Sequence, residues 1–271
     1  MSHLIRQSYI ISGQVQGVGF RPFVYRLAER LGLTGFVRNT AAGVNLEVQG
    51  EPAGLVAFVM ALRSALPPLA QITDMQVADI PAQPAERDFI IAGSEGATAP
   101  GVLVSPDVAL CGDCGRDIAN SGDRRYNYPF TNCTNCGPRY TITRSLPYDR
   151  PATSLACFPL CPDCAAEYEN PEDRRFHAQP TACPACGPTI GFYDAAGALL
   201  HQGEEAMRQA GQALARGKIV AVKGLGGFHL ACDAGNSEAV LRLRGRKNRP
   251  HKPLALMVPD LSTARAVVDL N

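Results

Sequence analysis

The sequence predicts an α+β protein of three consecutive regions, which we place at residues 1–93, 105–192 and 200–271. Three observations support this prediction. The first region alternates strand-like and helix-like hydrophobic periods and contains no cysteine. The second region contains nine of the ten cysteines, eight of them in Cys-x-x-Cys pairs. The third region returns to strand and helix patterns, which favour an α/β domain. Residues 93–100 are typical of a linker.

The first region has the element order β-α-β-β-α-β, which is that of a ferredoxin-like sandwich of one sheet and two helices. Apolar residues at helical spacing predict helices that begin near Phe20 and Leu55. Gly32 ends the first helix, and the prolines Pro67 and Pro68 end the second. Strand-like segments lie at residues 9–15, 35–39, 44–49, 72–80 and 89–92.

The cysteine pairs of the second region form a duplicated, zinc-ribbon-like motif. Its second half repeats the first at an offset of 50 residues, and matches such as Asn120 and Asn170 extend the repeat beyond the cysteines. Two Cys-x-x-Cys pairs at this spacing can close a tetrahedral zinc site, so we expect two zinc ions. Four thiolates leave no open position for water or substrate, so both zincs are expected to be structural. The pairs could combine within each repeat or between repeats. The expected ligands are Cys111, Cys114, Cys133, Cys136, Cys161, Cys164, Cys183 and Cys186.

Four arginines lie between the cysteine pairs, two in each repeat. A zinc ion with four thiolates carries a formal negative charge, so these arginines could donate to the sulfur atoms. The alternative is that they are solvated side chains on a loop. They are Arg124, Arg125, Arg174 and Arg175.

Three other residues that could bind metal fall outside the pattern of cysteine pairs. His177 lies between two cysteine pairs, but its counterpart in the first repeat is Asn127, which argues against a ligand role. Cys157 and Cys232 belong to no pair. We interpret both as small apolar residues and not as nucleophiles.

A glycine-rich turn follows the first predicted strand at residues 13–19, and a helix starts within or just after it. A strand, a glycine turn and a helix N-terminus in this order point several backbone N–H groups at one spot, which favours an anion site. Arg21 lies in the first helical turn, where a cation opposes the helix dipole by about 0.3–1 kcal/mol. Its position is therefore better explained if it faces a bound anion. The alternative is an ordinary glycine turn beside a surface arginine.

Two short segments, GQVQGVGFR at residues 13–21 and GFVRN at residues 35–39, resemble the two signatures of the acylphosphatase family. The resemblance implies that Arg21 and backbone amides hold a phosphate while Asn39 positions the attacking water, with no metal or covalent nucleophile. Catalysis would then consist of positioning and charge stabilisation. The amides that it implies belong to Gln16, Gly17, Val18, Gly19 and Phe20.

The third region is expected to begin with a helix at residues 206–215 and a strand near residue 219, followed by a basic run. Its segment KNRPHKPL at residues 247–254 resembles YrdC-like domains, which bind ATP and make carbamoyl-type adenylates. The resemblance implies a partial ATP site at Lys247, Arg249 and Lys252, whereas the alternative is a solvated basic face. Such a domain is longer than the residues present, so we expect an incomplete domain in a fragment or a truncated product.

The order of the three regions resembles the HypF family of carbamoyltransferases in nickel-iron hydrogenase maturation. The resemblance implies that carbamoyl phosphate is hydrolysed at the first site and that the carbamate is adenylated with ATP. A further domain, which this chain lacks, would transfer the carbamoyl group to the C-terminal cysteine of HypE. Two alternatives stay open: a stand-alone acylphosphatase whose zinc module docks a partner, and a pure binding module with a degenerate glycine loop.

Composition argues against two other classes of protein. The net charge of +1 gives no overall attraction to nucleic acid or anionic membranes. Residues 111–189 contain eight arginines, no lysine and nine carboxylates, which is not the basic face that phosphate-backbone binding requires. No apolar run approaches the roughly 18–20 residues of a membrane span, and the first residues do not resemble a signal peptide. We therefore expect a cytoplasmic protein that binds neither nucleic acid nor membranes.

Overall fold

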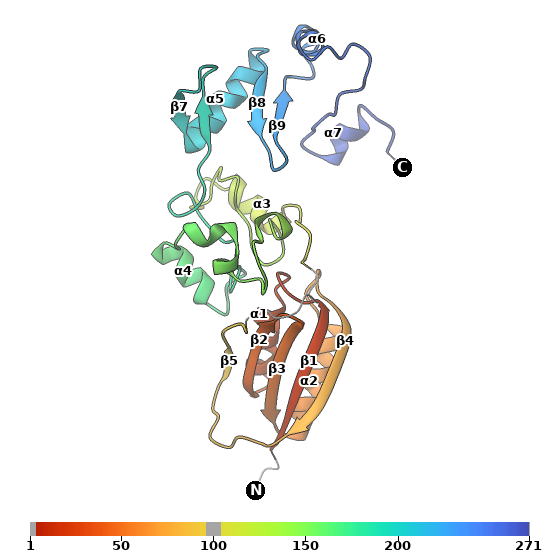
Figure 1. Cartoon of the computed structure of the whole chain (residues 1–271), viewed down its shortest axis with the longest axis vertical. Coiled ribbons are helices and arrows are strands. Elements are labelled where there is room, and N and C mark those ends of the chain that lie inside the picture. The colour runs from red at the N-terminus through yellow and green to blue at the C-terminus, as the bar shows by residue number, and fades with distance from the viewer. Residues whose placement is uncertain (1–3, 96–103, 271) are drawn as a thin grey trace. The chain divides into compact units, whose positions relative to one another are not determined.

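The computed structural model describes residues 4–95 and 104–270. The chain divides into two compact units, Met1–Thr189 and Ile190–Asn271, whose elements are labelled in Figure 1. Part of the expected linker, residues 96–100, lies outside the described residues. Within the described ranges, no helix is both long enough and apolar enough to cross a membrane.

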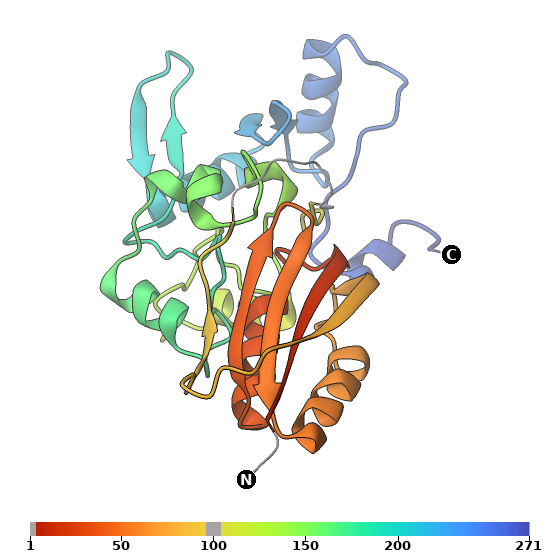
Figure 2. The same ribbon diagram turned by 60° about the horizontal axis from the view of Figure 1, so that its bottom comes forward.

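The N-terminal part of the first unit is a sandwich of one sheet and two helices. Its elements are β1 (Ile5–Gln14), α1 (Phe20–Arg30), β2 (Thr34–Thr40), β3 (Gly43–Gly50), α2 (Pro52–Ser64), β4 (Gln71–Ile80) and β5 (Phe89–Ile91). The strand order is β4-β1-β3-β2-β5, and neighbours are antiparallel except for the parallel pair β2 and β5. Both helices lie on the same face of the sheet (Figure 1 and Figure 2). The predicted ferredoxin-like sandwich is confirmed.

The core of this sandwich lies between the helices and the sheet. On α1, Val24, Leu27 and Ala28 are buried at the spacing that places side chains on one helix face. On β1, Tyr9 and Ile11 are fully buried and belong to the same cluster. Burying each large apolar side chain contributes roughly 1.5–3 kcal/mol. This packing fixes the ends of β1 and β2, which carry the candidate site.

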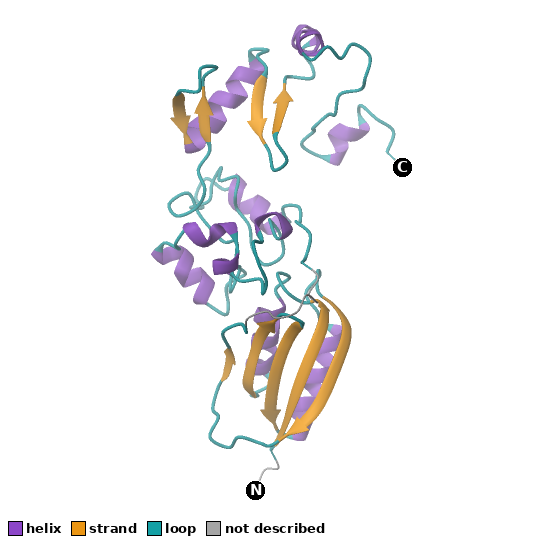
Figure 3. Cartoon of the chain, viewed as in Figure 1, coloured by secondary structure: helices purple, strands orange, loops and turns teal. Residues whose placement is uncertain are grey.

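The cysteine-rich part of the first unit repeats itself in structure as it does in sequence. Its helices are α3 (Gly112–Ala119) and α4 (Pro162–Glu169), and the short 3₁₀ turns are η1 (Tyr140–Ile142), η2 (Arg150–Ala152) and η3 (Ser154–Cys157). Cys111 and Cys161 are the N-cap residues of α3 and α4. Asn127 and His177, at the same offset, have φ of 54° and 53°. Loops dominate this part of the chain (Figure 3).

The second unit contains two small hairpins and three helices. Its elements are β6 (Gly191–Tyr193), β7 (Leu199–Gln202), α5 (Gly203–Ala215), β8 (Val220–Lys223), β9 (Phe228–Ala231), α6 (Ser237–Arg246) and α7 (Leu261–Arg265). The expected helix and strand correspond to α5 and β8, whereas the sequence analysis missed the hairpin of β6 and β7. Leu225 and Phe228 are 78% and 70% exposed, which fits the expectation of an incomplete domain.

Candidate functional site

The site begins where β1 turns into the glycine-rich loop. A β-bulge lies between Ser12 and Gly13, and Gly13 has a φ of 123°. A Cβ atom at this position would lie 2.2 Å from the carbonyl oxygen of Gln71. Only glycine fits this close approach of two strands. The bulge therefore sets the direction in which the chain leaves the sheet.

The loop then leads into α1 with its N-terminal N–H groups uncapped. Gly17 and Gly19 have φ of 70° and 76°, in the left-handed region that favours glycine. Gly19 is the N-cap of α1, and in the described part of the chain no side chain caps this helix and no acidic residue lies in its first turn. These N–H groups and the helix dipole form the kind of site that attracts an anion.

Arg21 and Asn39, which the sequence analysis selected, converge on one atom. Nη2 of Arg21 lies 3.4 Å from the carbonyl oxygen of Tyr148, and Nδ2 of Asn39 lies 3.3 Å from the same oxygen. Both side chains donate a hydrogen bond to it. Arg21 is 9% exposed and Asn39 is fully buried. Two donors from different elements, α1 and β2, are thus aimed at a single oxygen atom.

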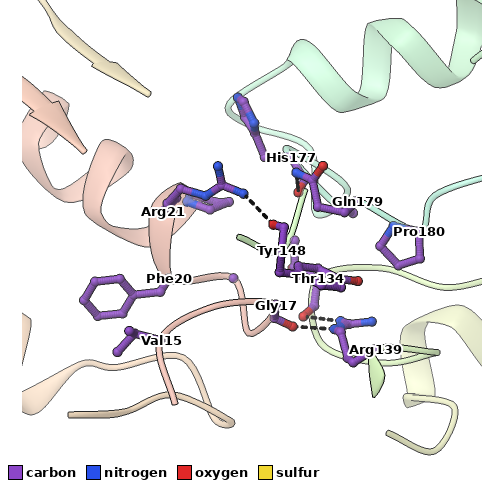
Figure 4. Close-up of a pocket in the computed structure, with 13 residues that line it drawn as sticks. Val15, Gly17, Phe20, Arg21, Thr134, Arg139, Tyr148, His177, Gln179 and Pro180 are labelled. Carbon is purple, nitrogen blue, oxygen red and sulfur yellow. Dashed lines mark hydrogen bonds between the residues drawn. The ribbon is translucent and has the colours of Figure 1, made fainter. Parts of the chain in front are cut away.

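The cysteine-rich part of the first unit, which we call the cysteine-rich half, forms the other wall of this site. The sequence analysis did not predict this contact. The carboxylate of Asp149 pairs with Arg21 at 2.6 Å and accepts a hydrogen bond from Ser94. A small pocket, partly open to solvent, lies between the glycine loop and this wall. Figure 4 shows Arg21 pointing at Tyr148 across the pocket. Its lining comprises Val15, Gly17, Gly19, Phe20, Arg21, Pro22, Thr134, Arg139, Tyr148, His177, Ala178, Gln179 and Pro180.

Arg139 joins the glycine loop to a cysteine pair. Its side chain is 1% exposed and donates to the carbonyl oxygen of Gly17 (Figure 4). It also donates to the carbonyl oxygens of Cys133 and Thr134 at 3.0 and 2.8 Å, and to that of Cys136 at 3.0 Å. A buried guanidinium with this many acceptors holds the two segments in a fixed relation.

Two titratable groups line the pocket in their uncharged forms. Burial, together with the positive charge of Arg21, lowers the pKa of His177 to about 4, so its imidazole is neutral at pH 7. Burial also raises the pKa of the Tyr148 hydroxyl to about 12. The imidazole of His177 and the hydroxyl of Tyr148 are therefore uncharged in this pocket. Arg21 pairs with the carboxylate of Asp149.

Gln16 shapes the loop through its side chain. Its Nε2 donates to the carbonyl oxygens of Thr40 and Gly43, each at 2.8 Å, and its Oε1 accepts from the backbone N–H of Tyr148 at 3.0 Å. Gln16 is 3% exposed. It therefore connects the glycine loop, the turn between β2 and β3, and the wall of the site.

The eight paired cysteines form two clusters, one in each repeat, and within each cluster the sulfur atoms lie within 4.8 Å of one another. Cys111 and Cys133 are 3.7 Å apart, and Cys161 and Cys183 are 3.6 Å apart. A tetrahedral zinc site with bonds of about 2.3 Å requires sulfur separations of about 3.8 Å, so the residues present fit zinc. The pairs combine within repeats, which resolves the pairing that the sequence left open. The clusters are Cys111, Cys114, Cys133 and Cys136, and Cys161, Cys164, Cys183 and Cys186.

Arginines of each repeat donate hydrogen bonds to the cysteine cluster of the other repeat. Arg124 donates to Sγ of Cys164 at 3.3 Å, and Arg174 donates to Sγ of Cys114 at 2.9 Å. The carboxylate of Glu167 pairs with Arg124 at 2.6 Å. Burial opposes ionisation of this carboxylate, but the hydrogen bonds from Arg125 and Arg124 outweigh it and hold its pKa at about 2. Donation to cysteine sulfur is thus observed for Arg124, Arg125 and Arg174, whereas Arg175 donates to Asp117 and to the carbonyl oxygen of Asn132. The exchange of donors between the repeats was not predicted.

The candidate nucleotide-binding residues and the unpaired Cys157 differ in exposure and in their contacts. Lys247 and Lys252 are exposed in the second unit, while Arg249 is half-buried and donates to the carbonyl oxygen of Pro253 at 2.9 Å. Cys157, which we interpreted as a small apolar residue and not as a nucleophile, has an exposed side chain. Its thiol donates to a backbone carbonyl of η3.

Comparisons with known proteins match all three regions. Family models match as acylphosphatase over residues 7–91, as HypF finger over residues 110–143 and 160–193, and as telomere recombination over residues 212–271. Carbamoyltransferase HypF2 of Cupriavidus necator is 52% identical over 262 residues, which is 96% of this chain and 32% of that protein. The chain spans about a third of the length of the curated relatives it matches.

Two solved structures share the fold over nearly the whole chain. A full-length HypF in the phosphate- and nucleotide-bound form is 42% identical, with a TM-score of 0.86, and the match covers 97% of this chain and 34% of that one. HypF of T. kodakarensis is also 42% identical, with a TM-score of 0.88, and the match covers 99% and 34%.

Proposed function

The chain belongs to the HypF family of carbamoyltransferases, and we propose that it catalyses the step at which carbamoyl phosphate is hydrolysed. The observation that carries this proposal is the convergence of Arg21 and Asn39 on one oxygen atom beside the uncapped N-terminus of α1. A phosphate oxygen placed at that point would accept the same two hydrogen bonds.

In this proposal the residues of the glycine loop hold the phosphoryl group. Arg21 donates a charge-assisted hydrogen bond, and the backbone amides of Gln16, Gly17, Val18, Gly19 and Phe20 provide the remaining donors. These donors are held in place by the glycine loop and α1 before substrate arrives, so once the phosphoryl group is bound they stabilise its charge without further movement. The pocket between the loop and its wall also limits the size of the acyl group.

Asn39 orients the attacking water. Among the described residues, no group donates to its buried Oδ1, which leaves that atom able to accept a hydrogen bond from water. Attack of the water on phosphorus breaks the bond between phosphorus and the acyl oxygen. The products are carbamate, inorganic phosphate and one proton. The acyl phosphate is already activated, so alignment and charge stabilisation suffice for catalysis.

The two cysteine clusters hold structural zinc in this proposal. All four ligand positions of each ion are thiolates, so zinc would stabilise the fold and would not contact the substrate. The three regions at residues 1–93, 105–192 and 200–271 would then be the hydrolytic domain, the zinc module and the start of a YrdC-like domain.

Later steps involve more than the described residues. The carbamate would react with ATP to give carbamoyl-adenylate and pyrophosphate, with Lys247, Arg249 and Lys252 forming part of the nucleotide site. The carbamoyl group would then pass to the C-terminal cysteine of HypE. Two findings support this order: residues 212–271 match the third family model, and a similar full-length HypF has been solved with nucleotide bound.

One observation favours an alternative for the chain by itself. The contacts that Arg21 makes lie within the first unit, which favours hydrolysis without ATP or the second unit. The chain would then act as a stand-alone acylphosphatase whose zinc module docks a partner.

Phosphate release from carbamoyl phosphate, measured with and without ATP, tests both versions. We expect release by the purified chain and at least tenfold slower release by Arg21→Ala at low substrate concentration. Release that needs no ATP and extends to acetyl phosphate and benzoyl phosphate supports the stand-alone version. No release from any of the three acyl phosphates by a folded, zinc-loaded chain contradicts the proposed hydrolysis.

A further inference from the structure

The segment Tyr148–Asp149 of the cysteine-rich half lies where the site would bind an anion. The carboxylate of Asp149 pairs with Arg21 at 2.6 Å. The carbonyl oxygen of Tyr148 accepts from both Arg21 and Asn39. An oxygen atom and a neighbouring negative charge, held by these two donors, are the features that a phosphate would present to them.

We propose that Asp149 is a built-in competitor for phosphate at Arg21, and that an arriving phosphate displaces it. The proposal rests on the proposed function, in which Arg21 binds the phosphoryl group. One guanidinium neutralises one negative charge, so a phosphate dianion and the Asp149 carboxylate side by side would repel each other. Phosphate therefore binds to the fraction of molecules in which Asp149 has left, and its apparent affinity is reduced by that fraction.

The anchoring of the segment allows such a release. Arg150, the next residue, is firmly held: its backbone N–H donates to Oε1 of Gln179 at 2.8 Å, and its side chain donates to the carbonyl oxygens of Gln179 and Thr181 at 2.8 Å. The Asp149 side chain is 24% exposed and is held by Arg21 and Ser94. Asp149 can therefore rotate toward solvent while Arg150 keeps the chain attached.

The displacement would reach the cysteine-rich half through the backbone of Tyr148. The N–H of this residue donates to Gln16 and its carbonyl oxygen accepts from Arg21 and Asn39. A phosphate that takes over these two donors removes the bonds that hold the carbonyl group of Tyr148 to α1 and β2, and among the described residues it leaves the bond to Gln16 as the remaining contact of this kind. The chain with phosphate bound and the chain without it would thus differ in the position of the segment Tyr148–Asp149.

Calorimetric titration with inorganic phosphate tests the competition, because this probe has no acyl group. We expect Asp149→Asn and Asp149→Ala to bind phosphate at least tenfold more tightly than the wild-type chain. Glu51→Gln is the matched control: it removes one exposed carboxylate that forms no cap bond, at the end of β3 away from the loop, and phosphate affinity should not change.

A second measurement needs no substitution. Added phosphate should speed hydrogen exchange at the amide of Tyr148 in the wild-type chain by several-fold, because the bond to Gln16 loosens. The proposal is overturned if the wild-type chain binds phosphate while both Asp149 variants bind it equally or more weakly, or if the amide becomes more protected. If neither the wild-type chain nor the Asp149 variants bind phosphate, the proposed function fails, and this proposal fails with it.

Discussion

The guanidinium of Arg174 donates to the sulfur of Cys114 at 2.9 Å, although the two residues belong to different repeats of the cysteine-rich half. The reverse contact also exists, from Arg124 of the first repeat to Cys164 of the second. Each cluster thus receives a hydrogen bond to sulfur from an arginine of the other repeat. Neither repeat can be described as a complete metal site with its own surroundings.

Loss of Arg174 should weaken the cluster in the opposite repeat. In Arg174→Ala, Cys114 loses a charge-assisted donor, and such changes around a metal site typically cost about 10–100-fold in affinity. We expect one of two zinc ions to pass faster to a chromophoric chelator while the other is little changed. Arg208→Ala, which removes an exposed arginine paired with Glu205 on α5, is the control. Equal release kinetics in both variants and the wild-type chain would refute the role of Arg174.

Two zinc ions should be present per folded chain. Because this part of the chain has little regular structure, strong chelators should unfold residues 111–189 and expose them to protease, while the sandwich stays folded. Elemental analysis gives the metal content, and limited proteolysis with mass spectrometry locates the unfolded part. A folded chain that contains one metal ion or none would contradict the assignment.

Arg21→Ala should weaken the binding of phosphate and of substrate together. Hydrogen bonds to charged groups contribute about 1.5–3 kcal/mol, so competitive inhibition by inorganic phosphate should weaken roughly 10–150-fold. The value of kcat/KM should fall at least as much. Steady-state assays with carbamoyl phosphate and inorganic phosphate measure both. Unchanged inhibition by phosphate would show that Arg21 does not bind the phosphoryl group.

Asn39→Ala should lower the rate more than it weakens phosphate binding. If Asn39 orients the water, its alignment matters on the way to the transition state, and kcat should fall by about a hundredfold. Inhibition by phosphate should weaken less than in Arg21→Ala, because the amide of Asn39 contributes one neutral hydrogen bond, worth about 0.5–1.5 kcal/mol. A loss of phosphate inhibition as large as that in Arg21→Ala, with kcat unchanged, would argue that Asn39 holds the phosphate and does not orient the water.

His177 should make the chain less stable in mild acid. Its pKa is about 4 in the folded chain and 6.5 in a model peptide, so between these values the unfolded chain binds the additional proton. The stability that neutral His177 contributes is present above pH 6.5 and is lost as the pH falls toward 4. The free energy of unfolding should drop by about 2 kcal/mol more between pH 7 and pH 5 in the wild-type chain than in His177→Gln. Urea titrations at the two pH values give this difference, and parallel curves would disprove the assignment.

Local patterns predicted the sandwich and both metal clusters from the sequence. The helix that begins at Phe20 and the alternation of Tyr9 and Ile11 depend on neighbours a few residues away, and so does the Cys-x-x-Cys spacing. Asp149 could not be found in this way. It lies 128 residues from Arg21, in a stretch without periodicity, and no local signal distinguishes it from a solvated aspartate. The negative charge of a four-thiolate zinc site suggested that Arg174 could donate to sulfur, with a solvated loop as the alternative, and the repeat alone cannot tell which of the two clusters this arginine contacts.

The position of Arg139 would link metal binding thermodynamically to the proposed phosphate binding. Its guanidinium connects the carbonyl oxygen of Gly17 to those of Cys133 and Cys136, so the shape of the glycine loop would depend on a cysteine pair that is expected to bind metal. Any metal-dependent gain in affinity for phosphate must be matched by an equal phosphate-dependent gain in affinity for the metal. Zinc in the first repeat would thus act as an effector of a reaction whose substrate it never touches.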